Sequence, residues 1–312
     1  MCGIAGELRI DSRPTQADWS RISELMKRRG PDDSGAWNDD RCNLVFRRLS
    51  ILDLTSAGHQ PMISENGRYV LVFNGEVYNF AELRRQLEQK GVRFRSHTDT
   101  EVVLYSLIEW GRDALERFNG MFALGFYDRQ ERKLLLARDH AGIKPLYYMR
   151  HSQGLMFASQ YDQLLAHPWS DGLPFSPAAS TLYLYLASVP APYGILDNTH
   201  MLEQGSWLEA DGAGHITRGR YYEFPRHQVP TLFGQEAVDA IDAAISSAVK
   251  RQLVSDVPVG AFLSGGVDSP LVCAKMHEAC TAGMHAYTKC TQHTDYYTQK
   301  RAHETLGKIS YT

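Results

Sequence analysis

The sequence contains few cysteines and no spacing that would pair them. Its 312 residues include five cysteines, an odd number without CxxC spacing, at Cys2, Cys42, Cys273, Cys280 and Cys290. Disulfide frameworks and structural zinc sites both need regularly spaced pairs. The sequence therefore argues against both classes, and we expect reduced thiols.

Long apolar runs and blocks of like charge are also missing. No run approaches the ~20 apolar residues that span a bilayer, and the N-terminus lacks the basic and apolar regions of a signal peptide. The 33 basic and 36 acidic residues give a net charge of -3 without a long run of one sign. Neither nucleic acid nor a membrane is therefore an expected partner, and we expect a cytoplasmic protein that acts on small molecules.

The apolar content, by contrast, is sufficient for two cores. With 43% apolar residues, a chain of this length predicts two domains. Strand-like and helical patterns are interleaved; the strand-like runs are 3–10, 43–46, 69–73, 121–127 and 133–137, and the helical ones 19–26, 81–90 and 100–110. This arrangement predicts stacked layers of sheets and helices. Turn-forming residues predict a loop over 29–35. The composition of 168–235, rich in proline, glycine and polar residues, indicates an interdomain region.

Cys2 directly follows the initiator methionine. Removal of Met1 would place a thiol and a free α-amine on one residue, and an amine with a pKa near ~8 can accept the thiol proton. Free cysteine is also among the most buried residue types, so Cys2 fits equally well as a small apolar residue that opens a strand. The N-terminus alone leaves both interpretations open.

A glycine-containing loop, Ser264-Gly265-Gly266-Val267-Asp268-Ser269, follows a second apolar run over 257–263 that predicts a buried parallel strand. Glycines let backbone N–H groups approach a phosphate, and the helix predicted over 271–278 adds partial positive charge at its N-terminus. The serine hydroxyls can donate hydrogen bonds, and Asp268 could hold Mg²⁺. An ordinary strand-to-helix turn is the alternative, but the context favours a nucleotide site.

Asn74 and Gly75 follow a strand-like run. A side-chain amide and a glycine N–H directed at one small volume are the donors that an oxyanion hole requires. The commonest use of this dipeptide is a hairpin turn, and taken alone the pair favours that turn.

Three charged residues near these segments complement an amino acid. Arg48 offers a planar fork for a carboxylate, whereas Glu76 and Asp99 could accept from an ammonium group. Individually, Arg48 fits a surface charge, and Asp99 or Thr98 fits an N-cap. Together with the thiol and the two donors, the set predicts acyl chemistry on an amino-acid side chain.

The sequence closely resembles the glutamine-dependent asparagine synthetases. The matching segments are Met1-Cys2-Gly3-Ile4-Ala5-Gly6, Arg29-Gly30-Pro31-Asp32, Arg48-Leu49-Ser50-Ile51, Gly58-His59-Gln60-Pro61-Met62, Asn74-Gly75-Glu76-Val77-Tyr78-Asn79, Gly120-Met121-Phe122-Ala123, Arg138-Asp139-His140-Ala141-Gly142-Ile143-Lys144-Pro145-Leu146-Tyr147 and Ser264 to Ser269. The first half alone would fit any amidotransferase with an N-terminal cysteine, and the last motif indicates the asparagine synthetase branch.

The resemblance implies a four-layer αββα N-terminal nucleophile hydrolase domain, a glutaminase, over 1–210. A linker over 211–235 and an incomplete ATP-pyrophosphatase (PP-loop) type parallel α/β domain over 236–312 would follow. In the glutaminase, Cys2 would attack the glutamine amide, and Asn74 and Gly75 would stabilise the oxyanion. The same resemblance implies that Arg48 binds the α-carboxylate and that Glu76 and Asp99 bind the ammonium. The backbone of Ile51 and Leu52 would line the pocket.

In the second domain, the resemblance implies that ATP binds to the loop with Mg²⁺ at Asp268. The ATP-binding residues would be Leu263, Ser264, Gly265, Gly266, Val267, Asp268 and Ser269. Aspartate would be activated as an acyl-adenylate, and ammonia would displace AMP to give asparagine. A homodimer is one assembly that the resemblance allows.

The sequence departs from the family pattern at Phe46, at Lys27-Arg28 and at Pro270, and most strongly after Lys289. The last segment is polar and lacks the family's acidic pair, so we expect a truncated or frameshifted synthetase domain. Two alternatives stay open. One is an amidotransferase that acts on a different carboxylate in a biosynthetic cluster, and the other is an inactive remnant or interaction module.

Overall fold

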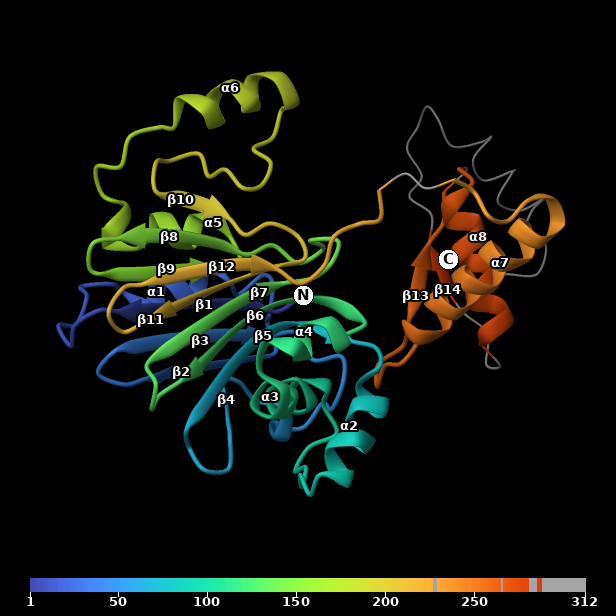
Figure 1. Cartoon of the computed structure of the whole chain (residues 1–312), viewed down its shortest axis with the longest axis horizontal. Helices are drawn as coiled ribbons and strands as arrows, with labels where there is room; N and C mark the ends of the chain where they lie inside the picture. The colour runs from blue at the N-terminus through green and yellow to red at the C-terminus, as the bar shows by residue number, and fades with distance from the viewer. Residues whose placement is uncertain (227–228, 265, 281–284, 288–312) are drawn as a thin grey trace. The chain divides into compact units, whose positions relative to one another are not determined.

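A computed structural model describes residues 1–226, 229–264, 266–280 and 285–287 (Figure 1). The chain divides into two compact units between Phe224 and Pro225. Among the helices of the described residues, none is long and apolar enough to cross a membrane.

The first unit contains two six-stranded sheets, each antiparallel throughout. The first sheet has the order β10-β8-β9-β1-β3-β2, with bounds β10 Thr199–Met201, β8 Tyr147–His151, β9 Gly154–Ala158, β1 Gly3–Arg9, β3 Cys42–Arg48 and β2 Asp33–Asn38. The second has the order β12-β11-β7-β6-β5-β4, with bounds β12 Ile216–Arg220, β11 Ser206–Asp211, β7 Lys133–Arg138, β6 Gly120–Asp128, β5 Tyr69–Val77 and β4 Met62–Ile63.

Helices cover the outer face of each sheet, as Figure 1 shows. The first sheet packs against α1 (Trp19–Leu25) and α5 (Tyr161–Leu165). The second packs against α2 (Phe80–Gln89), α3 (Asp99–Trp110) and α4 (Ala114–Arg117). The remaining helices of this unit are α6 (Pro177–Leu186) and the 3-10 turns η1 (Ser56–Gly58), η2 (Gly111–Asp113) and η3 (Pro168–Ser170). The predicted four-layer αββα fold is confirmed.

Alternation of side chains along the strands explains this layering. In β1, Ile4 and Leu8 face the second sheet, whereas Ala5 packs with the outer helices. In β5, Val70 and Val72 likewise point between the sheets, and the odd-numbered residues contact α3. Successive side chains of a strand point to opposite faces, so both faces of each sheet are buried.

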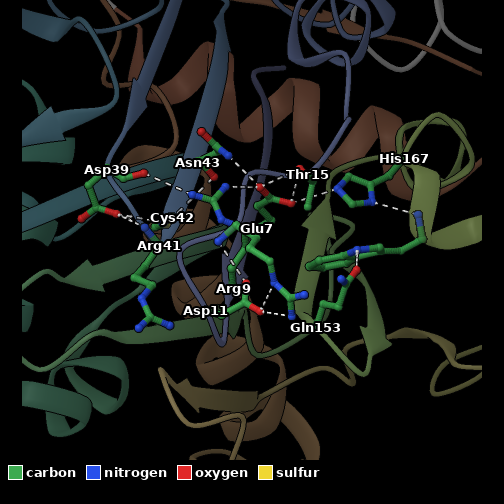
Figure 2. A network of polar contacts seen from close by, with 12 residues as sticks. Glu7, Arg9, Asp11, Thr15, Asp39, Arg41, Cys42, Asn43, Gln153 and His167 are labelled. Atoms are coloured by element: carbon green, nitrogen blue, oxygen red, sulfur yellow. Dashed lines mark hydrogen bonds and ion pairs between the residues drawn. The ribbon is translucent and has the colours of Figure 1, made fainter.

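A buried polar network crosses the first sheet (Figure 2). Glu7 is fully buried and accepts hydrogen bonds from Arg9, from Thr15 and from Asn43 Nδ2 at 2.6 Å. His167 Nε2 lies 3.0 Å from the other carboxylate oxygen. Hydrogen bonds and opposite charge satisfy a carboxylate that would otherwise be costly to bury.

The structure corrects three expectations for the first unit. Residues 33–35, predicted as loop, begin β2, because Asp33 to Asn38 pair with β3 despite their polar sequence. The region 168–235, predicted to lie between domains, contains α6 and β10–β12. The first unit also ends at Phe224 rather than at residue 210, since β12 pairs with β11.

The second unit begins with α7 (Gly234–Arg251), followed by β13 (Gly260–Phe262), α8 (Asp268–Ala279) and β14 (His285–Tyr287). β13 and β14 are parallel, as predicted for this domain. The expected burial of the strand over 257–263 is wrong, because Phe262 is 86% exposed and only Leu263 is buried. Among the described residues, β13 has β14 as its one strand partner, which leaves that side chain uncovered. The segment after Lys289, with Cys290, lies outside the described residues.

Candidate active site

Four predicted site residues converge because they occupy inward-facing positions on strands of the two facing sheets, or just before such a strand. Cys2 precedes β1 in the same alternation as Ile4 and packs against the core between the sheets. Arg48 ends β3, and Asn74 and Glu76 follow the inward-facing residues of β5. The period of two therefore directs all four side chains into the space between the sheets, at one end of the sandwich.

The Cys2 sulfur lies against the backbone at the end of β3. Leu49 N–H donates to Sγ at 3.4 Å, and the thiol approaches Leu49 O at 3.6 Å. Arg29 Nε fixes the Cys2 carbonyl at 2.9 Å. Burial raises the pKa of the Cys2 thiol, and the charge of Glu76 acts in the same direction, whereas the Leu49 hydrogen bond, the amino terminus and Lys144 act to lower it. The Leu49 hydrogen bond and the amino terminus therefore oppose the effect of burial.

The amino terminus is itself suited to accept a proton. Burial is the main cause that lowers the pKa of the Met1 ammonium; Lys144 and Arg29 lower it too, whereas the charges of Cys2 and Asp32 act to raise it. An amine that loses its proton more readily is a better base near neutral pH. Removal of Met1 would move this amine onto Cys2.

Asn74 and Gly75 lie within β5 rather than in a hairpin turn, since they pair with Ala123 and Phe122 of β6. Asn74 is 1% exposed, and its Nδ2 is buried without a hydrogen-bond partner in the described structure. A Cβ on Gly75 would lie 2.4 Å from Met121 O, so a larger residue does not fit there. An unpaired buried donor is costly, and an oxyanion would satisfy it.

The Arg48 guanidinium organises the loop after β3. Its Nη1 donates to Thr55 O at 2.8 Å, and its Nη2 donates to the carbonyls of Leu52 and Asp53. A Cβ on Gly58 would meet Nη2, so any larger residue there would displace the guanidinium. Guanidinium has five N–H donors, so two remain for another acceptor. Neither these hydrogen bonds of Arg48 nor the close approach at Gly58 was predicted from the sequence.

Glu76 and Asp99 form an acidic pair. Asp99, in the first turn of α3, is 4% exposed and accepts from Val77 N at 2.8 Å, while Thr98 is the N-cap. Burial raises the pKa of both carboxyls; the charge of Asp99 raises that of Glu76 further, and Lys144 opposes this. A raised pKa favours the protonated carboxyl, and an ammonium group beside the pair would relieve the repulsion between the two charges.

Most of these residues line one small pocket. Its lining comprises Cys2, Arg48, Leu49, Ile51, Leu52, Gly58, Gln60, Phe73, Gly75, Glu76, Thr98, Asp99 and Thr100. Seven of the eight residues predicted for the glutaminase site are among them; Asn74 lies beneath, next to Gly75. Gln60, for which no role was predicted, donates from its side-chain amide to Phe73 O and accepts from Phe73 N.

The predicted nucleotide loop joins β13 to α8. Ser269 Oγ lies 2.7 Å from Ser264 Oγ and accepts from Ser264 N at 2.9 Å, while Asp268 is the first residue of the helix. Val267 is 82% exposed. Leu263 is buried beneath the loop, and Gly265 lies outside the described residues. Hydroxyls at a helix N-terminus suit a phosphate.

No group of three or more metal-ligating side chains occurs in the part of the chain that the structure describes. If Asp268 held Mg²⁺, most of the ligands would come from phosphates and water, as is usual for this ion.

Two family models match this chain. A family model described as a glutamine amidotransferase domain matches residues 1–222, and one described as asparagine synthase matches residues 240–310. The chain belongs to the glutamine amidotransferase family. Its relatives are named asparagine synthetase [glutamine-hydrolyzing].

Among those relatives, asparagine synthetase 3 of Bacillus subtilis (strain 168) is 31% identical over 97% of this chain and 50% of its own length. Asparagine synthetase B of Escherichia coli (strain K12) is 32% identical over 88% of this chain and 44% of its own. The chain thus spans about half the length of the curated relatives it matches.

Among solved structures, a glutamine phosphoribosylpyrophosphate amidotransferase from B. subtilis, complexed with ADP and GMP, has a TM-score of 0.50 at 15% identity. The match covers 91% of this chain and 65% of that one. At this identity the likeness concerns the fold, and it agrees with the four layers described above.

Proposed function

We propose that the first unit, residues 1–224, hydrolyses glutamine to glutamate and ammonia at Cys2. The observation that carries this proposal is Asn74 Nδ2, a buried donor that has no partner among the described residues, beside a glycine on a pocket that Cys2 lines. That combination suits a nucleophile attacking a carbonyl whose oxygen becomes negative.

Glutamine binding follows from the charges of the pocket. The substrate ammonium would lie against Glu76 and Asp99, where it would lower the pKa of both carboxyls. The two N–H groups that Arg48 does not use on its loop would receive the α-carboxylate. Ile51 and Leu52 form the wall that this arginine holds in place.

The reaction requires removal of Met1, after which the α-amine of Cys2 accepts the thiol proton. The sulfur attacks the side-chain carbonyl of glutamine, and the oxygen takes the charge between Asn74 Nδ2 and Gly75 N–H. The tetrahedral intermediate collapses with cleavage of the C–N bond. The amine returns its proton to the leaving nitrogen, so ammonia departs and a thioester remains. Water then cleaves the thioester to give glutamate and the free thiol.

For the second unit we propose that ATP binds at the loop of Leu263 to Ser269 and supports amidation of aspartate to asparagine. The hydroxyls of Ser264 and Ser269 at the start of α8 fit a phosphate, and Asp268 would hold Mg²⁺. When bound, that ion would neutralise phosphate charge. The names of the relatives support asparagine as the product.

The test is glutamate release from glutamine by purified protein whose intact mass shows that Met1 is absent, with Cys2→Ala alongside. The proposal expects release that depends on Cys2, and a folded, processed protein without release contradicts it. Formation of AMP from ATP and aspartate, in the presence of glutamine, tests the second unit separately.

A further inference from the structure

Gln60 lies on the wall of the Cys2 pocket with its polar atoms already engaged. The residue is 3% exposed, and its side-chain Oε1 accepts from Phe73 N at 2.7 Å. Its Nε2 carries two N–H groups and donates to Phe73 O at 3.2 Å and to Thr100 Oγ1 at 3.4 Å. Because the protein itself uses the donors of this amide, the side chain is suited to hold the pocket wall rather than to bind a substrate.

These bonds occupy an edge of β5 that β4 leaves open. The pairing of β4 with β5 reaches Met62 opposite Leu71, and within the part of the chain that the structure describes no strand continues it along this edge. The same register would place Gln60 opposite Phe73, but Pro61 between them and β4 has no N–H to donate. The Gln60 amide instead gives Phe73 the two hydrogen bonds that one residue of a paired strand exchanges.

The Gly75 N–H points to the same edge of β5. Phe122 lies opposite Gly75 on β6 and uses its N–H and its carbonyl for Asp139, at 3.1 and 2.8 Å. The Gly75 N–H is therefore directed away from β6, toward the edge at which Phe73 meets Gln60, since alternate residues of a strand direct their N–H groups to one edge. Gly75 and Gln60 both line the pocket.

Side chains hold β5 on either side of the Gly75 N–H. Before it, Gln60 bonds Phe73, and after it, Val77 N donates to a carboxylate of α3 at 2.8 Å. The Phe73 carbonyl that Gln60 binds belongs to the peptide group that joins Phe73 to Asn74. Loss of the Gln60 amide would release this peptide group, and with it the orientation of both oxyanion donors.

We propose that Gln60 is a positioning residue of the glutaminase, whose amide holds β5 so that Gly75 N–H and Asn74 Nδ2 receive the oxyanion. This inference rests on the proposed function and adds to it the group that orients both donors. Donors that are fixed before the reaction stabilise the transition state without reorganisation. A misplacement of ~1 Å can lower a rate by about 10²-fold.

The test compares two buried glutamines of the first unit in the full chain after removal of Met1. Gln60→Met removes one amide, and Gln163→Met removes another from α5, where Gln163 is fully buried and accepts from Gln160 N at 3.1 Å. Gln60→Met should lower kcat for glutamate release by a factor of about 10–10² with KM nearly unchanged, because it displaces the donors and leaves the substrate-binding charges. Gln163→Met should leave both constants unchanged, whatever its melting temperature.

Alkylation of Cys2 distinguishes displaced donors from general damage to the site. The sulfur displaces iodide from iodoacetamide, so a C–S bond replaces the C–I bond and no oxygen between the donors becomes negative. The rate, followed by peptide mass at fixed pH, should therefore be equal in Gln60→Met and in the wild type. A pocket that had lost its structure would change the alkylation rate together with kcat.

Wild-type kcat in folded Gln60→Met overturns the inference, and so does an equal loss of kcat in Gln163→Met or a parallel change in the alkylation rate. If Gln60→Met does not fold, Gln60→Asn serves in the same assays, because its shorter side chain cannot bond both backbone groups of Phe73. A processed wild type that releases no glutamate contradicts the proposed function and this role together. Cys2-dependent release that Gln60→Met retains in full contradicts this role alone.

Discussion

Leu49 N–H donates to Cys2 Sγ at 3.4 Å and so joins the start of the chain to the segment that leaves β3. The sulfur therefore has a fixed position before any substrate binds. Leu49 directly follows Arg48, whose guanidinium holds the next turn of the same segment. Nucleophile and pocket wall are thus positioned by one stretch of backbone.

Asn74→Ala should reduce glutamate release by a factor of about 10²–10³, mainly through kcat, as for loss of one oxyanion donor. The fold should tolerate the change, because Nδ2 has no partner to lose. Steady-state kinetics and a thermal melt check both statements. Asn38→Ala, at an exposed end of β2, is the control. A loss confined to KM would show that Asn74 binds the ground state instead.

Gly58→Ala should weaken glutamine binding. The added methyl would meet Arg48 Nη2 at 1.9 Å and displace the guanidinium from the loop carbonyls. We expect KM to rise at least tenfold with a smaller change in kcat, since Arg48 does not contact the reacting amide. Ser56→Ala, an exposed change in the same turn, should leave KM unchanged. An unaltered KM in Gly58→Ala would show that the Arg48 position is not needed for binding.

Glu76→Gln should stabilise the ligand-free protein at neutral pH. Folding raises the pKa of Glu76 above its ordinary 4.5, through burial and the charge of Asp99. The folded state therefore binds more protons than the unfolded one, and the free energy of unfolding falls as pH rises from 4.5 through the raised pKa. Melting temperatures from pH 5 to 8 should show the variant gaining on the wild type with rising pH, while its affinity for glutamine falls. A difference in melting temperature that stays constant from pH 5 to 8 would contradict a raised pKa at Glu76.

Glu7→Gln should destabilise the first unit by about 3–5 kcal/mol, because it breaks a buried pair and leaves Arg9 without its carboxylate. Although burial alone would raise the pKa of Glu7, hydrogen bonds from His167, Asn43 and Arg9 lower it. A lowered pKa gives stability that is present above 4.5 and is lost as pH falls through the folded pKa. Urea unfolding at pH 7 and pH 3 should therefore show a large difference that shrinks in acid.

The control for that experiment is Glu24→Gln. Glu24 forms ion pairs with Lys27 and Arg47, but its side chain is 56% exposed. Exposed pairs are screened by water and contribute little. A comparable loss of unfolding free energy in both variants would show that removal of the charge, rather than burial of the ion pair, causes the destabilisation.

Much of the layered fold could be predicted because its central strands carry strong alternation. β5 and β6 have apolar residues on both faces, and α3 begins at a clear N-cap, Thr98. β2 was not predicted, because Asp33 and Asn38 are polar and the strand lies at the edge of its sheet. β11 and β12 were not predicted, because their glycine and polar residues are also typical of a linker. Their strand conformation depends on pairing with other strands.

The site was predictable where side chains lie on recognisable motifs, as for Cys2, Asn74 and Glu76. Gly58 was not, because the close approach there comes from the guanidinium of Arg48, ten residues earlier in the chain. The charges that act on Lys144 likewise come from three other segments as well as from its own. Contacts between segments that are distant in the sequence form only when the two sheets pack together, so no local sequence pattern predicts them.

The most direct measurement is acid quench of the processed protein a few milliseconds after mixing with glutamine, followed by mass analysis of the N-terminal peptide. The account predicts a glutamyl thioester on the Cys2 sulfur, absent in Cys2→Ala and diminished in Asn74→Ala. Glutamate release without any covalent adduct at Cys2, or with release preserved in Cys2→Ala, would contradict it.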